Sequence, residues 1–181
     1  GKITEEFGIG AGMGLGSMAY ALVRVAGYLG QPELLDDARR AVAQINPETV
    51  ARDRRHDLLF GASGAILALL AAPELEAEPA WRARIVTCAE HLLAARVPTA
   101  SGHRSWPTGE GAAALTGFSH GAAGVAYALA RAAAVTGRED FLAAAREGVA
   151  YENSQFGAGE GNWLDHRQLP AGGPGMPLCS W

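Results

Sequence analysis

The strongest constraint on the fold of this chain is an internal repeat. When the sequence is shifted by 107 residues, so that Gly14 meets Gly121, 13 of the 30 positions from Gly14 to Ala43 are identical without a gap. The longest match sets Ala19-Tyr20-Ala21-Leu22 against Ala126-Tyr127-Ala128-Leu129. Shared alanine content does not align tyrosine, arginine, glycine and valine together. The chain therefore contains copies of one structural unit.

A third copy lies between these two. Gly61-Ala62-Ser63-Gly64 aligns with Gly121-Ala122-Ala123-Gly124, and an apolar run follows it. Each unit is a glycine-rich turn, an alanine-rich helix, a loop and a second, amphipathic helix. First helices are expected at residues 17–26, 65–72 and 125–135, and second helices begin near Pro32, Pro79 and Arg138. Segments 73–79 and 98–117 are loops by composition.

The two helices of each unit differ in polarity, which predicts two layers. The first helices are small or apolar on most sides, whereas the second carry charges such as Asp36, Asp37 and Arg40. A helix that is apolar on most sides is buried, and an amphipathic helix faces solvent. The expected fold is therefore all-α, with an inner and an outer helix layer. Repeated hairpins of this kind form an open solenoid or a closed α/α toroid.

The charge of the chain excludes some classes of function. The formal net charge of −4 argues against a general nucleic-acid binder. One basic cluster, Arg52, Arg54, Arg55 and His56, is interpreted as a solvated loop. No apolar stretch approaches the roughly 20 residues that span a bilayer, so no transmembrane segment is expected. No signal peptide is evident either.

The chain has two cysteines, Cys88 and Cys179. Two distant cysteines in an alanine-rich helical chain are expected to be free thiols in a reducing compartment, which predicts a cytoplasmic protein. Cys88 shares a helical stripe with Ile85 and Leu92, so we expect it in the core.

A histidine stands out at the start of one inner helix. The residue before the first glycine of the unit is Met13, Phe60 and His120 in the three copies. The repeat does not require histidine there, so His120 hints at function, although it can also be a surface residue beside a capped helix. The field of a helix N-terminus favours the neutral ring, which can accept a proton.

Asp57 is a second departure from the repeat, since the aligned positions hold Gly10 and Gly117. An aspartate just before a helix often serves as a cap or dipole partner. Alternatively, Asp57 and His120 form an acid/base pair at equivalent ends of adjacent inner helices. The sequence leaves both interpretations of Asp57 open.

These segments together resemble the lanthionine cyclase family. The resemblance rests on the glycine-rich turns Asp57-Leu58-Leu59-Phe60-Gly61-Ala62-Ser63-Gly64 and Gly117-Phe118-Ser119-His120-Gly121-Ala122-Ala123-Gly124, and on Tyr151-Glu152-Asn153-Ser154-Gln155-Phe156 and Gly161-Asn162-Trp163-Leu164-Asp165-His166-Arg167. It extends from about Gly8 to Trp181 and is greatest to the C-terminal cyclase domain of LanM-type, class II lanthipeptide synthetases.

The resemblance implies an α/α toroid of seven hairpins around a zinc ion held by Cys, Cys and His. It also implies a dehydrated precursor peptide as partner, in which cysteine thiols add to dehydroalanine or dehydrobutyrine to form thioether rings. His120 would deprotonate the thiol or protonate the enolate. Asp57 would orient a polar group or share in the proton transfer.

Residues 1–181 are then expected to be the N-terminal part of such a domain, with about three of seven hairpins. Ser180-Trp181 matches the start of the family run Ser-Trp-Cys-His-Gly, so the zinc ligands would follow Trp181. Cys179 is not expected to be a ligand. This part alone is predicted to bind no zinc, to be inactive, and to self-associate through the open end of the toroid.

Two other functions remain open. One is a non-catalytic helical-repeat module that binds peptides or a partner protein. The other is an α/α-toroid sugar hydrolase that uses Asp57 with a second acid, but no carboxylate pair is evident at the helix starts.

Overall fold

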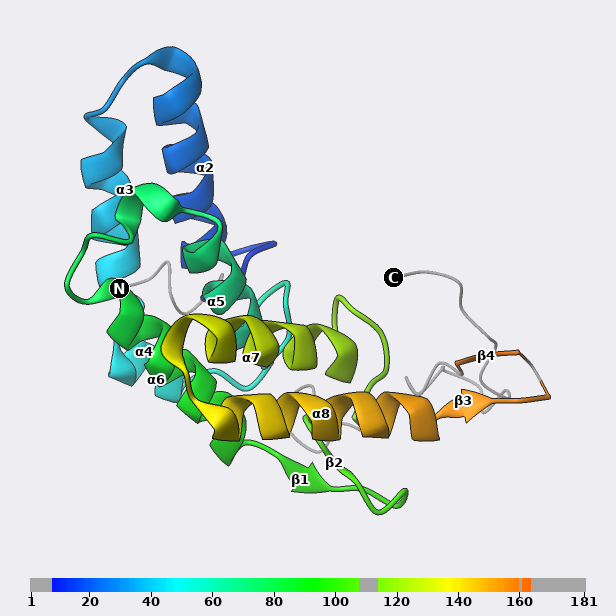
Figure 1. Cartoon of the computed structure of the whole chain (residues 1–181). Coiled ribbons are helices and arrows are strands. Elements are labelled where there is room, and N and C mark those ends of the chain that lie inside the picture. The colour runs from blue at the N-terminus through cyan, green and yellow to red at the C-terminus, as the bar shows by residue number, and fades with distance from the viewer. Residues whose placement is uncertain (1–7, 108–113, 160, 164–181) are drawn as a thin grey trace.

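A computed structural model describes residues 8–107, 114–159 and 161–163. Within them, three helical hairpins follow one another along the chain (Figure 1). They pair α2 (Leu15–Leu29) with α3 (Leu34–Ala43), α5 (Ala62–Leu70) with α6 (Trp81–Ala94), and α7 (Ala122–Thr136) with α8 (Glu139–Ser154). All six helices predicted from the repeat are present, although their ends differ by a few residues.

Shorter elements lie between and after the hairpins. They are α4 (Pro47–Ala51), the 3-10 turn η1 (Pro73–Leu75), the antiparallel pair β1 (Val97–Pro98) and β2 (Arg104–Ser105), and the antiparallel pair β3 (Phe156–Gly157) and β4 (Asn162–Trp163). The segments expected to be plain loops therefore contain η1 and β2. Composition did not reveal them because each is held by a few hydrogen bonds, such as Glu76 N to Pro73 O at 3.0 Å.

The hairpins form two layers. The first helices lie side by side, with α5 in contact with both α2 and α7. Each second helix packs against its own first helix, and α6 also contacts α8. In Figure 1, α2 and α3 lie at one side of the molecule, α7 and α8 at the other, and α5 and α6 between them. This arrangement confirms the all-α fold with inner and outer helices.

The core is built from small side chains between closely packed helices. Helix α5 buries residues on nearly all sides, including Ala62, Ala65 and Ile66. Larger side chains such as Leu129 and Phe141 are fully buried in the same core. Because this packing leaves little spare volume, removing a large core side chain opens a cavity and costs about 2–5 kcal/mol.

Two inner helices end in the same way. Gly30 follows α2 with φ 64° and Gly137 follows α7 with φ 74°, both in the left-handed region that glycine adopts without strain. The two glycines occupy aligned positions of the repeat, so the repeated sequence specifies a repeated helix end.

The inner helices also begin in the same way. The N–H of the third helical residue donates to a carbonyl seven residues earlier: Ser17 to Gly10 at 3.0 Å, Gly64 to Asp57 at 3.3 Å and Gly124 to Gly117 at 3.4 Å. A Cβ at Gly64 or Gly124 would overlap the carbonyl oxygen of Leu58 or Phe118. The glycines are needed because the turn folds back against its own helix.

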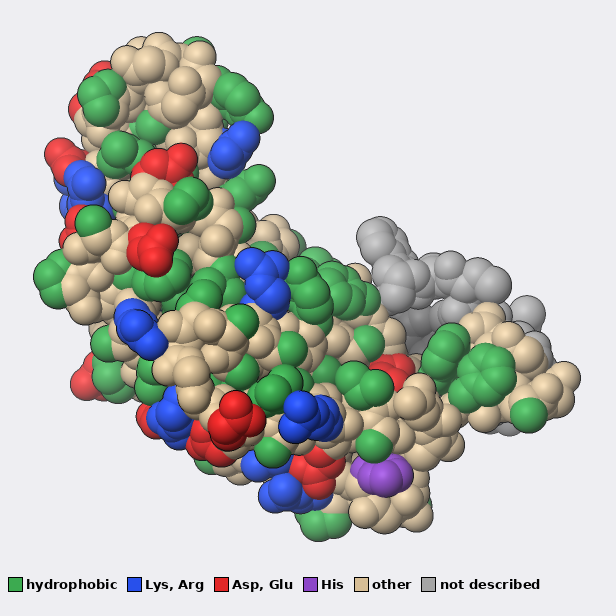
Figure 2. Space-filling model, viewed as in Figure 1, with side chains coloured by type: hydrophobic (Ala, Val, Ile, Leu, Met, Phe, Trp, Pro, Cys, Tyr) green, Lys and Arg blue, Asp and Glu red, His purple; other side chains and the backbone are tan. Residues whose placement is uncertain are grey.

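The surface has mixed character. Figure 2 shows acidic and basic side chains interspersed on the visible face. In the described ranges, no helix is both long enough and apolar enough to cross a membrane.

Candidate functional site

Three glycine-rich turns meet at the N-terminal ends of the inner helices. The turn before α2 pairs with the turn before α5, through Ile9 N to Phe60 O at 3.0 Å and Gly12 N to Leu59 O at 3.0 Å. The turn before α5 joins the turn before α7 through Leu58 N to Ser119 O at 3.1 Å. Because these bonds fix the turns against one another, side chains far apart in sequence come together here.

Asp57 and His120 are in direct contact at this junction. His120 Nδ1 lies 2.7 Å from Asp57 Oδ2. The other oxygen, Oδ1, accepts hydrogen bonds from Phe60 N at 2.7 Å and Gly61 N at 3.2 Å. Asp57 is 2% exposed, whereas the His120 side chain is 38% exposed. The structure thus joins a buried, fixed carboxylate to an imidazole that solvent or a ligand can reach.

This contact determines the tautomer of His120. A carboxylate oxygen only accepts, so the ring donates through Nδ1–H, and in the neutral ring Nε2 carries the lone pair. A carboxylate that orients the imidazole of a general base in this way is common in enzymes. The Asp57 carboxylate therefore caps its own turn and contacts His120, and its part in acid/base chemistry stays a prediction.

An aromatic side chain borders the ring, and a cationic group lies against that aromatic side chain. Phe60 stacks on His120, with ring centroids 6.1 Å apart. The Arg55 guanidinium carbon lies 5.3 Å from the centroid of Phe60. Two apolar side chains of the neighbouring turns, Met13 and Phe118, are 48% and 45% exposed. The surroundings of His120 therefore suit a ligand with apolar parts.

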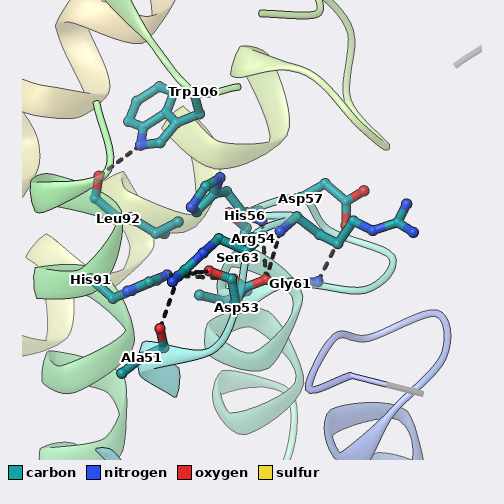
Figure 3. Close-up of polar contacts among 12 residues, drawn as sticks. Ala51, Asp53, Arg54, His56, Asp57, Gly61, Ser63, His91, Leu92 and Trp106 are labelled. Carbon is teal, nitrogen blue, oxygen red and sulfur yellow. Dashed lines mark hydrogen bonds and ion pairs between the residues drawn. The ribbon is translucent and has the colours of Figure 1, made fainter. Parts of the chain in front are cut away.

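The segment before Asp57 is anchored by a buried polar cluster (Figure 3). His91 Nε2 donates to Asp53 O at 3.1 Å, and His56 Nδ1 donates to Pro107 O at 2.9 Å. Burial lowers the pKa of His91 below its ordinary value. His56 has φ 60°, which is rare for a residue with a side chain.

The interpretation of residues 52–56 as a solvated loop holds for the arginines and is wrong for His56. Arg52, Arg54 and Arg55 are exposed, but His56 is 6% exposed. The left-handed backbone at His56 turns its side chain inward, toward His91, and a sequence pattern does not show that turn.

Comparison with known proteins identifies the family. A family model described as lanthionine synthetase C-like protein matches residues 3–181. The chain belongs to the lanthionine synthetase C-like family. No curated protein and no solved structure matches the chain. The family match supports a lanthionine-cyclase type of function and a peptide substrate. The family fold is an α/α toroid, and the helical hairpins of this chain are consistent with it.

The described residues do not provide a ligand set for the zinc ion that the sequence resemblance implies. Among residues 8–107, 114–159 and 161–163, no group of three His, Cys, Asp or Glu side chains could hold a metal ion. Cys88 is fully buried, as expected, and burial raises its pKa to about 12, so it stays a thiol rather than a thiolate ligand. Cys179 lies outside the described residues.

Sequence reasoning did not assign a role to Glu152 or Asp53, although both support the site. Glu152 Oε1 accepts hydrogen bonds from Gly117 N at 2.9 Å and Ala123 N at 2.7 Å, on either side of His120. Glu152 follows Phe141 by 11 residues, on the buried stripe of α8. The sequence signal for Glu152 is a charged residue on an apolar helical stripe. The signal for Asp53 is an acidic residue within the basic run 52–56.

Proposed function

We propose that this chain is part of a lanthionine cyclase domain in which His120 transfers a proton during thioether formation. The observation that carries the proposal is the 2.7 Å contact between His120 Nδ1 and Asp57 Oδ2. It couples a buried carboxylate to an accessible ring at the junction of three turns.

In the proposed reaction, the thiol of a peptide cysteine adds across the double bond of dehydroalanine or dehydrobutyrine. The sulfur loses its proton and bonds to Cβ of the alkene, and the resulting enolate takes up a proton at Cα. The Nε2 atom of His120 accepts the thiol proton or, once protonated, donates to the enolate. Asp57 keeps Nδ1 protonated and stabilises the imidazolium when it forms.

We further propose that the chain belongs to a LanM-type synthetase and acts in the cytoplasm. The free Cys88 thiol supports a reducing compartment. Zinc, when bound, would make the peptide thiol a better nucleophile. Its ligands would have to come from residues other than those that the structure describes.

The test is His120→Ala in the full-length protein that contains this chain. Thioether formation, measured by mass spectrometry of a dehydrated peptide, should slow about 10²- to 10⁴-fold, the usual contribution of a general acid or base. Zinc content should not change. His103→Ala, in the β1–β2 hairpin, is the matched control and should retain the wild-type rate.

Two results would reject the assignment. A normal rate for His120→Ala means that the residue is dispensable, and loss of zinc means that its role is structural or ligating. If peptide binds equally well to wild type and His120→Ala but no thioether forms in either, the alternative of a non-catalytic binding module is favoured.

A further inference from the structure

We propose that two buried carboxylates outside the pair, Glu152 and Asp53, are positioning residues that hold the turns carrying His120 and Asp57 in register. The inference rests on the proposed function of that pair. It concerns how the fold keeps an imidazole and a carboxylate at hydrogen-bonding distance when they lie 63 residues apart.

Glu152 holds the His120 turn. One oxygen, Oε1, accepts from Gly117 N and Ala123 N, three residues before and three residues after His120. The neighbouring Tyr151 donates from its hydroxyl to Ala114 O at 2.7 Å, just upstream of the same turn. Glu152 is 8% exposed. Helix α8, in the outer layer, thus fixes both ends of the segment that presents the ring.

Asp53 holds the Asp57 turn in a similar way. Its Oδ2 accepts from Ala62 N at 2.8 Å, at the first residue of α5. Its Oδ1 accepts from Arg55 N at 2.9 Å and His56 N at 3.3 Å. Asp53 is 9% exposed. The Asp53 carboxylate therefore bridges the two ends of the segment that contains Asp57. Figure 3 shows Asp53 and Asp57 in this segment.

The first repeat shows that the fold of a unit does not require such a carboxylate. Among the described residues, the first N–H groups of α2 donate to backbone carbonyls, with Leu15 N bonded to Gly8 O at 3.3 Å and Gly16 N to Ile9 O at 3.2 Å. The supporting carboxylates occur in the two units that carry Asp57 and His120.

Burial of Glu152 also has a cost. Removal from water raises its pKa, and the two backbone N–H donors only partly oppose that shift. The first repeat folds without such a buried carboxylate. We therefore explain Glu152 by its effect on the position of His120 rather than by stability alone.

Two substitutions of Glu152 separate the effect of side-chain length from the effect of charge. Glu152→Gln retains an oxygen that can accept both hydrogen bonds but removes the charge, whereas Glu152→Asp retains the charge but is one methylene shorter. We expect Gln to preserve the site and Asp to disrupt it. At position 53 both oxygens accept N–H donors, so Asp53→Asn should disrupt the site, because its amide nitrogen would face a donor.

The measurement is the imidazole nitrogen NMR spectrum of the 181-residue chain labelled on histidine. The His120 resonances are assigned by their loss in His120→Ala. Wild type and Glu152→Gln should show one tautomer, with Nδ1 protonated and Nε2 bare, and Glu152→Asp and Asp53→Asn should lose this pattern. Glu147→Gln, on the same helix but paired with Arg96 and Arg104, is the control and should keep it.

In the full-length protein, Glu152→Asp should slow thioether formation about 10²-fold, as expected for misplacement of a reacting group, and Glu152→Gln should restore most of the rate. An unchanged tautomer in Glu152→Asp and Asp53→Asn, with both variants folded by circular dichroism, overturns the positioning role. Equal loss of the His120 tautomer in Glu152→Gln and Glu152→Asp also overturns the positioning role. The NMR result does not depend on catalysis, so it stands or fails separately from the proposed function.

Discussion

The imidazole of His120 depends on Asp57 for the location of its proton, and Asp57→Asn tests this dependence. Asparagine can still accept from Phe60 N and Gly61 N through one oxygen, but it then presents an amide N–H to the Nδ1 position of His120. Two donors face each other, and the ring must change tautomer or turn away. Thioether formation should fall about 10²-fold or more.

The measurement for Asp57→Asn is the same peptide mass assay, together with thermal unfolding. Unfolding should change little, because both backbone hydrogen bonds survive. A wild-type rate in a folded Asp57→Asn protein would show that the carboxylate orients nothing that the reaction needs.

His91 gives the fold a pH dependence at the scale of one residue. Burial lowers the pKa of its ring in the folded state, while nearby Asp53 opposes the shift and His56 and Arg54 add to it. The unfolded chain, with an ordinary histidine value of about 6.5, then takes up a proton more readily. The contribution of His91 to stability is present above that value and is lost as the pH falls.

His91→Gln tests this contribution, since glutamine can still donate to Asp53 O and does not titrate. The free energy of unfolding, measured by urea denaturation from about pH 7.5 to pH 5 across the ordinary histidine value, should fall less steeply in the variant than in wild type. Parallel curves would mean that His91 does not carry the pH dependence.

At the scale of the helices, the glycine-rich starts are the elements most sensitive to a single added carbon. A Cβ at Gly124 would overlap the carbonyl oxygen of Phe118, whereas a Cβ at Gly27, within α2, has open space around it. Gly124→Ala should therefore destabilise the protein by about 1–3 kcal/mol. Gly27→Ala should stabilise it by about 0.5–1 kcal/mol through helix propensity.

Thermal or urea unfolding of the two glycine variants gives the comparison directly. Equal effects of the same substitution at both positions would mean that helix propensity, and not the contact between turn and helix, governs the inner helix starts.

The helices themselves were predictable because their signals are local. The repeat, the apolar runs and the aligned Gly30 and Gly137 located all six long helices. The short elements were missed for the opposite reason. Helix α4 depends on the Asn46 side chain accepting from Thr49 N at 2.9 Å, and β1 and β2 form through a pairing across several residues. Such elements leave no periodic pattern.

At the scale of the whole molecule, one end of the row of inner helices exposes apolar side chains. On α2, Val25, Tyr28 and Leu29 are 40%, 77% and 63% exposed. The self-association predicted from the sequence stays a prediction, and these residues allow a test. Sedimentation velocity of the 181-residue chain should show mass increasing with concentration.

Substitutions at two places distinguish association through this α2 surface from non-specific hydrophobic association. Val25→Lys with Leu29→Lys should shift the chain toward monomer, whereas Val149→Lys, at a residue of α8 that is 50% exposed, should not. A monomer at all concentrations for the wild-type chain would contradict the prediction.

The sequence by itself determined the repeat, the two helix layers and the two residues that break the repeat, Asp57 and His120. These features follow from local composition and from comparison of the three repeat copies. Only the tertiary structure decided that the two side chains touch, that His56 turns inward, and that Glu152 and Asp53 hold the turns. These contacts join residues up to 63 positions apart through particular backbone angles and hydrogen bonds, and no pattern along the chain encodes such distances.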